Sequence, residues 1–151
     1  MSELWRPSVT VAAVIERGGR FLLVEEEIDG RRVLNQPAGH LDRGESLLAA
    51  CRREVLEETA HHFAPRALVG IYRWRYAPKD VTFLRFCFSG DLEGVAPGRA
   101  LDHGIVAARW LSGDELLARK AQHRSPLVAQ CERDFLAGRR FPLELLSPEF
   151  A

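Results

Sequence analysis

The sequence predicts a single α/β domain in which a mixed β-sheet lies between helices. Three observations support this fold class: strand-like segments surround one central helix, turn residues separate them, and two capped helices close the chain. With 151 residues, 46% of them hydrophobic, the chain is long enough to bury one good core. We therefore expect residues 1–151 to form one domain.

The first part of the chain favours antiparallel strands joined by short turns. Strands are predicted at residues 9–15, 21–25 and 32–34. Gly18-Gly19 turns the first strand into the second, and Asp29-Gly30 is a strong two-residue hairpin pattern. These segments are expected to pair as neighbours.

A loop around Gly39 then leads to a helix predicted at about residues 46–59. Two starts of this helix are compatible with the sequence. Asp42 and Glu45 have the spacing of a capping box, and Ser46 is itself a suitable N-cap. The sequence alone does not choose between them.

The remaining elements follow the same logic. Further strands are predicted at residues 67–76, 81–89 and 105–111. Ser112 and Glu115 form a capping box that opens a short helix. Ser125-Pro126 opens a final helix that ends near Gly138.

Composition excludes several classes of partner. The 21 basic and 21 acidic residues cancel, so no overall field favours nucleic acid or anionic lipid. No apolar run is long enough to span a bilayer, and the N-terminus lacks a signal-peptide core. Cys51, Cys87 and Cys131 are interpreted as small buried residues in a reducing compartment. We expect a cytoplasmic protein.

The central helix carries an unusual group of acids. Glu54, Glu57 and Glu58 stand at positions i, i+3 and i+4, so they share one face near the helix C-terminus. The helix dipole disfavours negative charge there, and like charges at this spacing repel. A solvated face with Arg53 paired to Glu57 is the simplest alternative. A hard divalent cation held by oxygen ligands would relieve both unfavourable effects.

These acids belong to a longer pattern, Gly-x5-Glu-x7-Arg-Glu-aliphatic-x-Glu-Glu. The matching residues are Gly39, Glu45, Arg53, Glu54, Val55, Glu57 and Glu58. The pattern resembles the Nudix box, the signature of hydrolases that cleave a diphosphate linked to another moiety. The resemblance implies an α/β/α sandwich and an enzyme acting on acid anhydrides in phosphorus-containing compounds.

Two positions depart from the family pattern. After the last glutamate pair and one spacer residue the family has glycine followed by an aliphatic residue, whereas this chain has Ala60 and His61. Glycine would end the helix in a left-handed conformation without steric cost, and alanine there costs about 1–2 kcal/mol. The departure affects the helix end and removes no carboxylate.

Segments outside the box resemble the NudJ-type branch of the family. They are residues 9–12, 35–41, 83–86, 109–111, 124–128 and 142–144. This resemblance implies a phosphatase of low specificity that depends on Mg²⁺, with Mn²⁺ able to substitute. It acts on nucleoside tri- and diphosphates and on thiamine-pathway pyrophosphates, namely hydroxymethylpyrimidine pyrophosphate and thiamine pyrophosphate.

The resemblance also implies roles for the box residues. The metal ligands are Glu54, Glu57, Glu58 and the backbone carbonyl of Gly39. Arg53 and Glu45 orient these carboxylates, so the catalytic group comprises Arg53, Glu45, Glu57 and Glu58.

The group that accepts the proton from water is left open. Glu57 or Glu58 could serve, or a metal-bound water could ionise without a separate base. Asp102, just before a predicted strand, is the best candidate outside the box, because related enzymes often place an acid there. The alternative for Asp102 is an ordinary loop residue beside Gly104.

Residues that recognise the substrate are harder to identify. Arg73 and Arg75 alternate with aromatic residues and could bind phosphate beside a stacked base. The same alternation describes any half-buried strand. Gln36, Arg85 and His40 are further candidates, His40 because it lies in the loop next to the metal site.

Several functions agree with these observations. The leading one is hydrolysis of small pyrophosphates, with no nucleic-acid or membrane partner and with monomer and homodimer both open. Hydrolysis of ADP-ribose or dinucleoside polyphosphates is the nearest enzymatic alternative. A non-catalytic nucleotide-sensing module is disfavoured because every box carboxylate is present, and an enzyme for RNA ends is disfavoured by the balanced charge.

Overall fold

A computed structural model describes residues 2–147, which form two β-sheets and three α-helices. The larger sheet is mixed and has the order β5-β1-β7-β6. Its strands are β1 (Ser8–Val14), β5 (Ala38–His40), β6 (His61–Tyr76) and β7 (Val81–Val95). Strands β1 and β7 run parallel, whereas β5 pairs with β1 and β6 pairs with β7 in antiparallel fashion.

The smaller sheet is antiparallel and is centred on β3 (Arg20–Ile28). Strand β8 (Ile105–Ser112) pairs with one edge of β3. Strands β2 (Glu16–Arg17) and β4 (Arg31–Asn35) also pair with β3. The sheet brings the end of β3 and the loop before β8 close together, since the Glu27 N–H donates to the Gly104 carbonyl.

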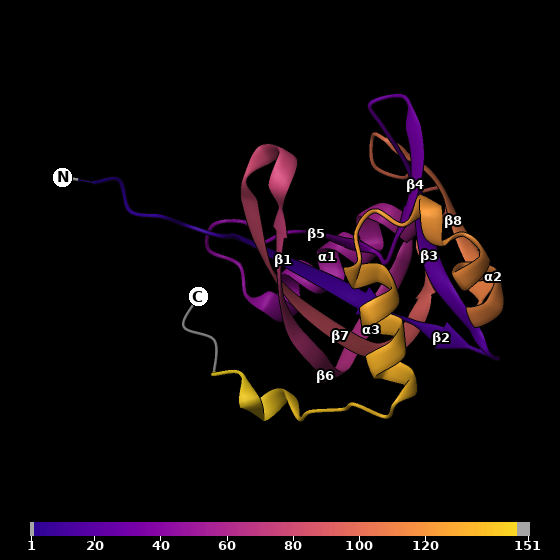
Figure 1. The fold of residues 1–151 in the computed structure, drawn as a ribbon. Helices are drawn as coiled ribbons and strands as arrows, with labels where there is room; N and C mark the ends of the chain where they lie inside the picture. Colours follow the sequence, from indigo (N-terminus) through magenta and orange to yellow (C-terminus); the bar gives the residue numbers. More distant parts are fainter. Residues whose placement is uncertain (1, 148–151) are drawn as a thin grey trace.

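Helices α1 (Leu47–Thr59) and α3 (Leu127–Leu136) pack on opposite faces of the mixed sheet (Figure 1). Alternate residues of β1 divide between them: Val11 and Ala13 pack with α1, whereas Ala12 and Val14 pack with α3. Helix α2 (Gly113–Ala118) follows β8. Short 3₁₀ turns are η1 (Ala77–Lys79), η2 (Lys120–Gln122) and η3 (Leu143–Leu145). The predicted α/β/α sandwich is confirmed.

Local sequence patterns predicted the turns and caps well. Gly18-Gly19 and Asp29-Gly30 all have positive φ, as the two-residue hairpins require. The start of α1 is now decided, because Ser46 is the N-cap and its side chain accepts a hydrogen bond from Ala49 N.

Three predicted boundaries were wrong. The loop around Gly39 contains the short strand β5, and the strand predicted at residues 67–76 begins at His61, directly after α1. The strand predicted at residues 81–89 continues to Val95. In each case pairing with a distant strand extends the element beyond what local propensity indicates.

The end of α1 keeps the geometry that the family's glycine would allow. Ala60 lies in the left-handed region, with φ 59° and ψ 24°, and its N–H donates to the Leu56 carbonyl. An alanine side chain is disfavoured in this conformation by about 1–2 kcal/mol. The chain therefore tolerates local strain immediately after the three acids.

None of the helices within residues 2–147 combines the length and the apolar composition needed to cross a bilayer.

Candidate active site

Helix α1 has two unlike faces. Ala50, Cys51 and Val55 are buried in the core against β1 and β7. Because these residues fix the rotation of the helix, its acids project towards strand β5, which lies at the edge of the mixed sheet. The site is thus built where a charged helix face meets a free strand edge.

Strand β5 offers backbone groups to that helix face. Its bonds to β1 fall on odd-numbered residues, since Ala13 N donates to Pro37 O and Leu41 N donates to Val9 O. By antiparallel alternation Gly39 pairs with Val11, so its carbonyl points towards β1. The backbone groups of the neighbouring residues Ala38 and His40 point outwards.

Arg53 organises one side of the site. Its guanidinium donates to both carboxylate oxygens of Glu45, at 3.0 and 2.6 Å, and to the His40 carbonyl at 2.9 Å. It also donates to Glu54 at 2.8 Å and to Glu57 at 3.2 Å. The Arg53–Glu57 pair expected on a solvated helix face is present, but only as part of this larger network. Hydrogen bonds from Arg53 lower the pKa of Glu45.

Glu58 is in a different situation. Only 7% of its surface is exposed, and its carboxylate accepts a 2.7 Å hydrogen bond from the outward-pointing N–H of Ala38. Within residues 2–147 it forms no ion pair with a basic side chain. Burial, and then the charges of Glu26, Glu54 and Asp102, raise its pKa to about 9, against the hydrogen bond from Ala38.

Glu54 and Glu57 complete the acid face. Burial raises the pKa of both, and the charge of Asp102 adds to the effect, while Arg53 acts in the opposite direction. Asp102 is an exposed residue whose backbone N–H donates to the Glu57 carbonyl at 3.0 Å. The structure therefore brings this predicted residue next to the helix, from a loop more than forty positions away in sequence.

The donor set fits a hard divalent cation. Several carboxylates crowd together with raised pKa values, and a positive ion would reverse that effect. A side chain at Gly39 would collide with the Glu54 carboxylate where it now lies, so glycine gives this acid room beside β5. Among residues 2–147, however, no three acidic, histidine or cysteine side chains are already arranged to hold a metal. Arg53 donates to both Glu54 and Glu57, so one guanidinium positions two of the three acids.

The predicted substrate residues lie in different places. His40 adjoins the site through its carbonyl, and its ring lies 6.4 Å from that of Phe83. Arg73 and Arg75 are exposed on β6, at the opposite edge of the mixed sheet from β5, and Arg75 pairs with Asp80 at 2.8 Å. The structure does not bring these two arginines to the acids.

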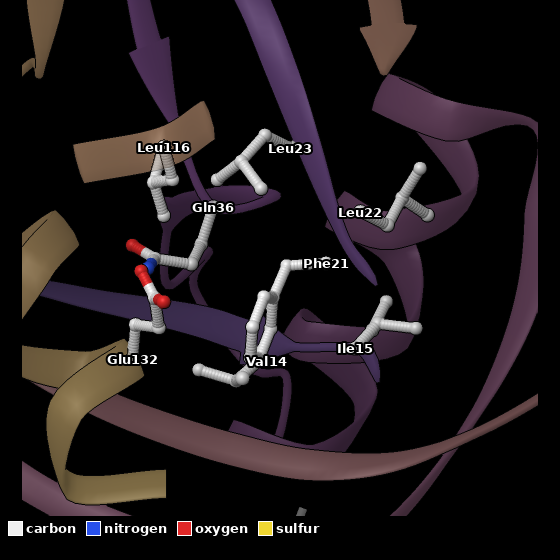
Figure 2. A pocket seen from close by; sticks show the side chains of 8 residues that line it. All are labelled: Val14, Ile15, Phe21, Leu22, Leu23, Gln36, Leu116 and Glu132. Carbon is white, nitrogen blue, oxygen red and sulfur yellow. The ribbon is translucent and has the colours of Figure 1, made fainter. Parts of the chain in front are cut away.

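Gln36 and Arg85 lie together in the interior. Arg85 is 6% exposed and donates to Gln36 and to Asn35, at 3.0 Å each, and the Gln36 amide donates to the Val128 carbonyl. The Gln36 and Glu132 side chains line a narrow core space whose other walls are apolar (Figure 2). This network ties β7 and α3 to the residues that precede β5.

Two groups in the site were not predicted from the sequence. The Ala38 N–H holds Glu58, and Glu26, which is 9% exposed on β3, contributes to the raised pKa of Glu58. The run Glu25-Glu26-Glu27 at the end of a strand was the available indication, since alternation turns some of these side chains inwards. Which acid they would meet depends on strand pairing.

Comparison with known sequences agrees with this geometry. The NUDIX domain family profile matches residues 4–131. The chain is 42% identical over 143 residues to phosphatase NudJ of Escherichia coli (strain K12), covering 95% of this chain and 92% of that protein. Phosphatase NudJ of Shigella sonnei (strain Ss046) matches with the same identity and coverage.

Solved structures give the same picture. A NUDIX hydrolase from Nitrosomonas europaea superimposes with a TM-score of 0.93 and is 54% identical, covering 95% of this chain and 98% of that one. A MutT NUDIX hydrolase from Burkholderia pseudomallei, at 20% identity, shares the fold with a TM-score of 0.73, covering 86% of this chain and 98% of that one.

Proposed function

The chain belongs to the Nudix family and is a hydrolase of pyrophosphate bonds in small molecules, and from this premise we propose a Mg²⁺-dependent phosphatase of the NudJ type. Its proposed substrates are nucleoside tri- and diphosphates and the pyrophosphates of the thiamine pathway. Nudix hydrolases generally use a divalent metal, and the proposal specifies Mg²⁺, with Mn²⁺ able to replace it.

One observation carries this proposal. Glu58 is a buried acid that forms no ion pair with any basic side chain within residues 2–147, and burial raises its pKa to about 9. Burying a carboxyl group in this way is unfavourable unless something compensates it. A cation that arrives from outside supplies that compensation.

We assign the roles of the site as follows. Glu54, Glu57 and Glu58 would hold the cation, which would neutralise phosphate charge, polarise the phosphoryl group and favour ionisation of the attacking water. Glu45 fixes Arg53, which in turn fixes the carboxylates of Glu54 and Glu57. Loss of Arg53 would leave the acids unrestrained without removing any ligand.

The backbone ligand is assigned one residue earlier than the family pattern suggests. Gly39 supplies space for Glu54, while its carbonyl is turned towards β1. The Ala38 carbonyl points the same way as the Ala38 N–H, towards Glu58, because both groups of a strand residue share one side. We therefore assign the backbone oxygen to Ala38 and the steric role to Gly39.

Asp102 is proposed as the proton acceptor or as an additional ligand. Its position against the last turns of α1 and its effect on the pKa of Glu57 both support a role beside the reacting phosphate. An Asp102→Asn substitution should lower kcat more than it raises KM, because the substrate is held mainly by other groups.

Product analysis tests the proposal. The purified protein is incubated with Mg²⁺ in ¹⁸O-water with nucleotides, thiamine pyrophosphate or ADP-ribose, and products are resolved by phosphorus NMR. The NudJ-type proposal predicts stepwise release of labelled orthophosphate from nucleoside tri- and diphosphates. Nucleoside monophosphate with inorganic pyrophosphate, or inactivity towards diphosphates, would contradict it, and preference for ADP-ribose would favour the alternative branch.

A further inference from the structure

The proposed function requires a basic group that can meet the substrate. A pyrophosphate carries several negative charges, and positioned arginines commonly supplement metal ions in phosphoryl transfer. Arg53 cannot serve, because its N–H groups are engaged by Glu45, Glu54, Glu57 and the His40 carbonyl. Another arginine near the acids is therefore the candidate for this contact.

Arg124 lies in the segment between η2 and α3. It begins the stretch of residues 124–128, to which the proposed function assigns no role. Its backbone N–H donates to the Leu34 carbonyl at 2.8 Å, and the preceding residue, His123, forms a parallel bridge with Leu34. The segment thus pairs with β4 only four residues before Ala38, which holds Glu58. This pairing places the Arg124 backbone beside the strand that leads towards β5.

The side chain of Arg124 is also directed inwards by an acid of the site. Its guanidinium donates to Glu26 at 2.7 Å, and Glu26 is the acid whose charge acts on Glu58. The Glu26 side chain is only 12% exposed, whereas that of Arg124 is 44% exposed. The buried partner anchors the guanidinium, and within residues 2–147 its other N–H groups meet no side-chain acceptor.

The other nearby arginines are less suitable. Arg85 is 6% exposed and bonded to Asn35 and Gln36. Arg109 pairs with Glu25 at 2.8 Å, and Glu25 points to the opposite face of β3 from Glu26. Of these arginines, Arg124 alone is both adjacent to the acids and open.

We propose that Arg124 binds a phosphate oxygen of the substrate while Glu26 holds its guanidinium beside the metal-binding acids; this inference rests on the function proposed above. Arg124 uses one N–H on Glu26, so its planar fork retains donors for a phosphate. The chemistry it recognises is a diphosphate, whatever group the diphosphate carries.

Arg109 provides a matched control. The Arg109–Glu25 pair joins a side chain that is 43% exposed to one that is 11% exposed, nearly the same as the Arg124–Glu26 pair. Arg124→Gln and Arg109→Gln should therefore change stability similarly. Only the first should change phosphate affinity.

The affinity for methylenediphosphonate, a non-hydrolysable diphosphate, is measured by calorimetry with Mg²⁺ for the wild type and for Arg124→Gln, Arg109→Gln and Glu26→Gln. Arg124→Gln should weaken binding by about tenfold to a hundredfold, as expected for a charge-assisted hydrogen bond. Arg109→Gln should stay within about twofold of the wild type. Glu26→Gln should weaken binding less than Arg124→Gln does, because the arginine remains but loses its charged anchor.

An equal loss of analogue affinity in Arg124→Gln and Arg109→Gln would overturn the inference. An equal loss of affinity in Arg124→Gln and Glu26→Gln would also overturn it, because Arg124 would then act only as the ion-pair partner of Glu26. Should Arg124→Gln fail to fold, Arg124→Lys preserves the charge; the inference then requires at least about threefold weaker binding, and unchanged affinity contradicts it. Binding of the analogue without turnover of any substrate would refute the proposed function but leave this test intact.

Discussion

Two buried carboxylates, one on each of the helices that cover the mixed sheet, have opposite environments. Asp134 of α3 is 7% exposed, and its carboxylate has several partners within the protein. It accepts hydrogen bonds from the Tyr72 hydroxyl, at 2.7 Å, and from the Gln130 amide, and the Arg139 guanidinium lies 3.7 Å away. Burial opposes its ionisation, but the hydrogen bonds and charges outweigh burial and lower its pKa.

Glu58 of α1 is equally buried and receives one backbone hydrogen bond, from Ala38. Its pKa rises to about 9 because burial and neighbouring acids act together. A carboxylate that the protein supplies with hydrogen bonds and charge contributes to folding, whereas the one left without a basic partner is the one that we propose binds a cation. The sequence alone does not distinguish these two helical acids. Their hydrogen-bond and ion-pair partners in the folded protein do.

The largest expected difference between the two acids is in catalysis. Glu58→Gln should lower kcat by about 10²–10³-fold, because the bound metal supplies several kcal/mol to the transition state and each 1.36 kcal/mol is a factor of ten. Asp134→Asn, the matched amide substitution, should leave kcat within a few-fold of the wild type. Steady-state assays with the preferred substrate compare them. Full activity in Glu58→Gln would remove this residue from the site.

The next difference is in the pH dependence of stability. Folded, metal-free protein binds the Glu58 proton up to pH about 9, whereas the unfolded chain releases it near pH about 4.3. Between these values the folded state holds more protons, so the contribution of Glu58 to the free energy of unfolding falls as pH rises, by at most about 1.4 kcal/mol per pH unit. Glu58→Gln should remove this decline.

Denaturant titrations of metal-free protein from pH 5 to 9 measure the effect. The free energy of unfolding of Glu58→Gln, relative to the wild type, should increase steadily with pH. A constant difference across the range would mean that Glu58 titrates normally, and the contrast with Asp134 would disappear.

A smaller effect is expected on stability at neutral pH when Asp134 is changed. Asp134→Asn should reduce the free energy of unfolding by about 1–2 kcal/mol, because charge-assisted hydrogen bonds from Tyr72 and Gln130 become neutral ones. Since its pKa is lowered, this stabilisation is present above the unfolded pKa and is lost on acidification through the folded pKa. Thermal unfolding at pH 7 and pH 3 should show a difference that shrinks in acid.

The smallest effect concerns the end of α1. Ala60→Gly should stabilise the protein by about 0.5–1 kcal/mol, because relief of left-handed strain exceeds the added chain entropy of glycine. Urea denaturation measures it, and Ala137→Gly, at a helix end with ordinary φ of −72°, is the control that should not stabilise. Loss of stability in Ala60→Gly would show that the alanine methyl group contributes packing.

The elements that local chemistry specifies were predictable from the sequence. Positive φ at Gly18 and Asp29 follows from turn preferences, and the cap at Ser112 follows from its spacing to Glu115. The acids of α1 were found in the same way, since three glutamates at helical spacing must share a face.

The contacts that were not predicted from the sequence depend on which strands become neighbours. Arg73 and Arg75 have a suitable pattern, yet the sheet order places two strands, β1 and β7, between β6 and β5. Glu26 and Arg124 are 98 residues apart and meet only because the segment before α3 pairs with β4. Pairing across such separations leaves no local trace in the sequence.

The most direct test of the central claim is anomalous diffraction from crystals soaked in Mn²⁺ at a concentration that supports turnover. A peak should appear between the carboxylates of Glu54, Glu57 and Glu58 and the Ala38 carbonyl, with Asp134 free of metal. An active enzyme whose only manganese peaks lie elsewhere would contradict the account.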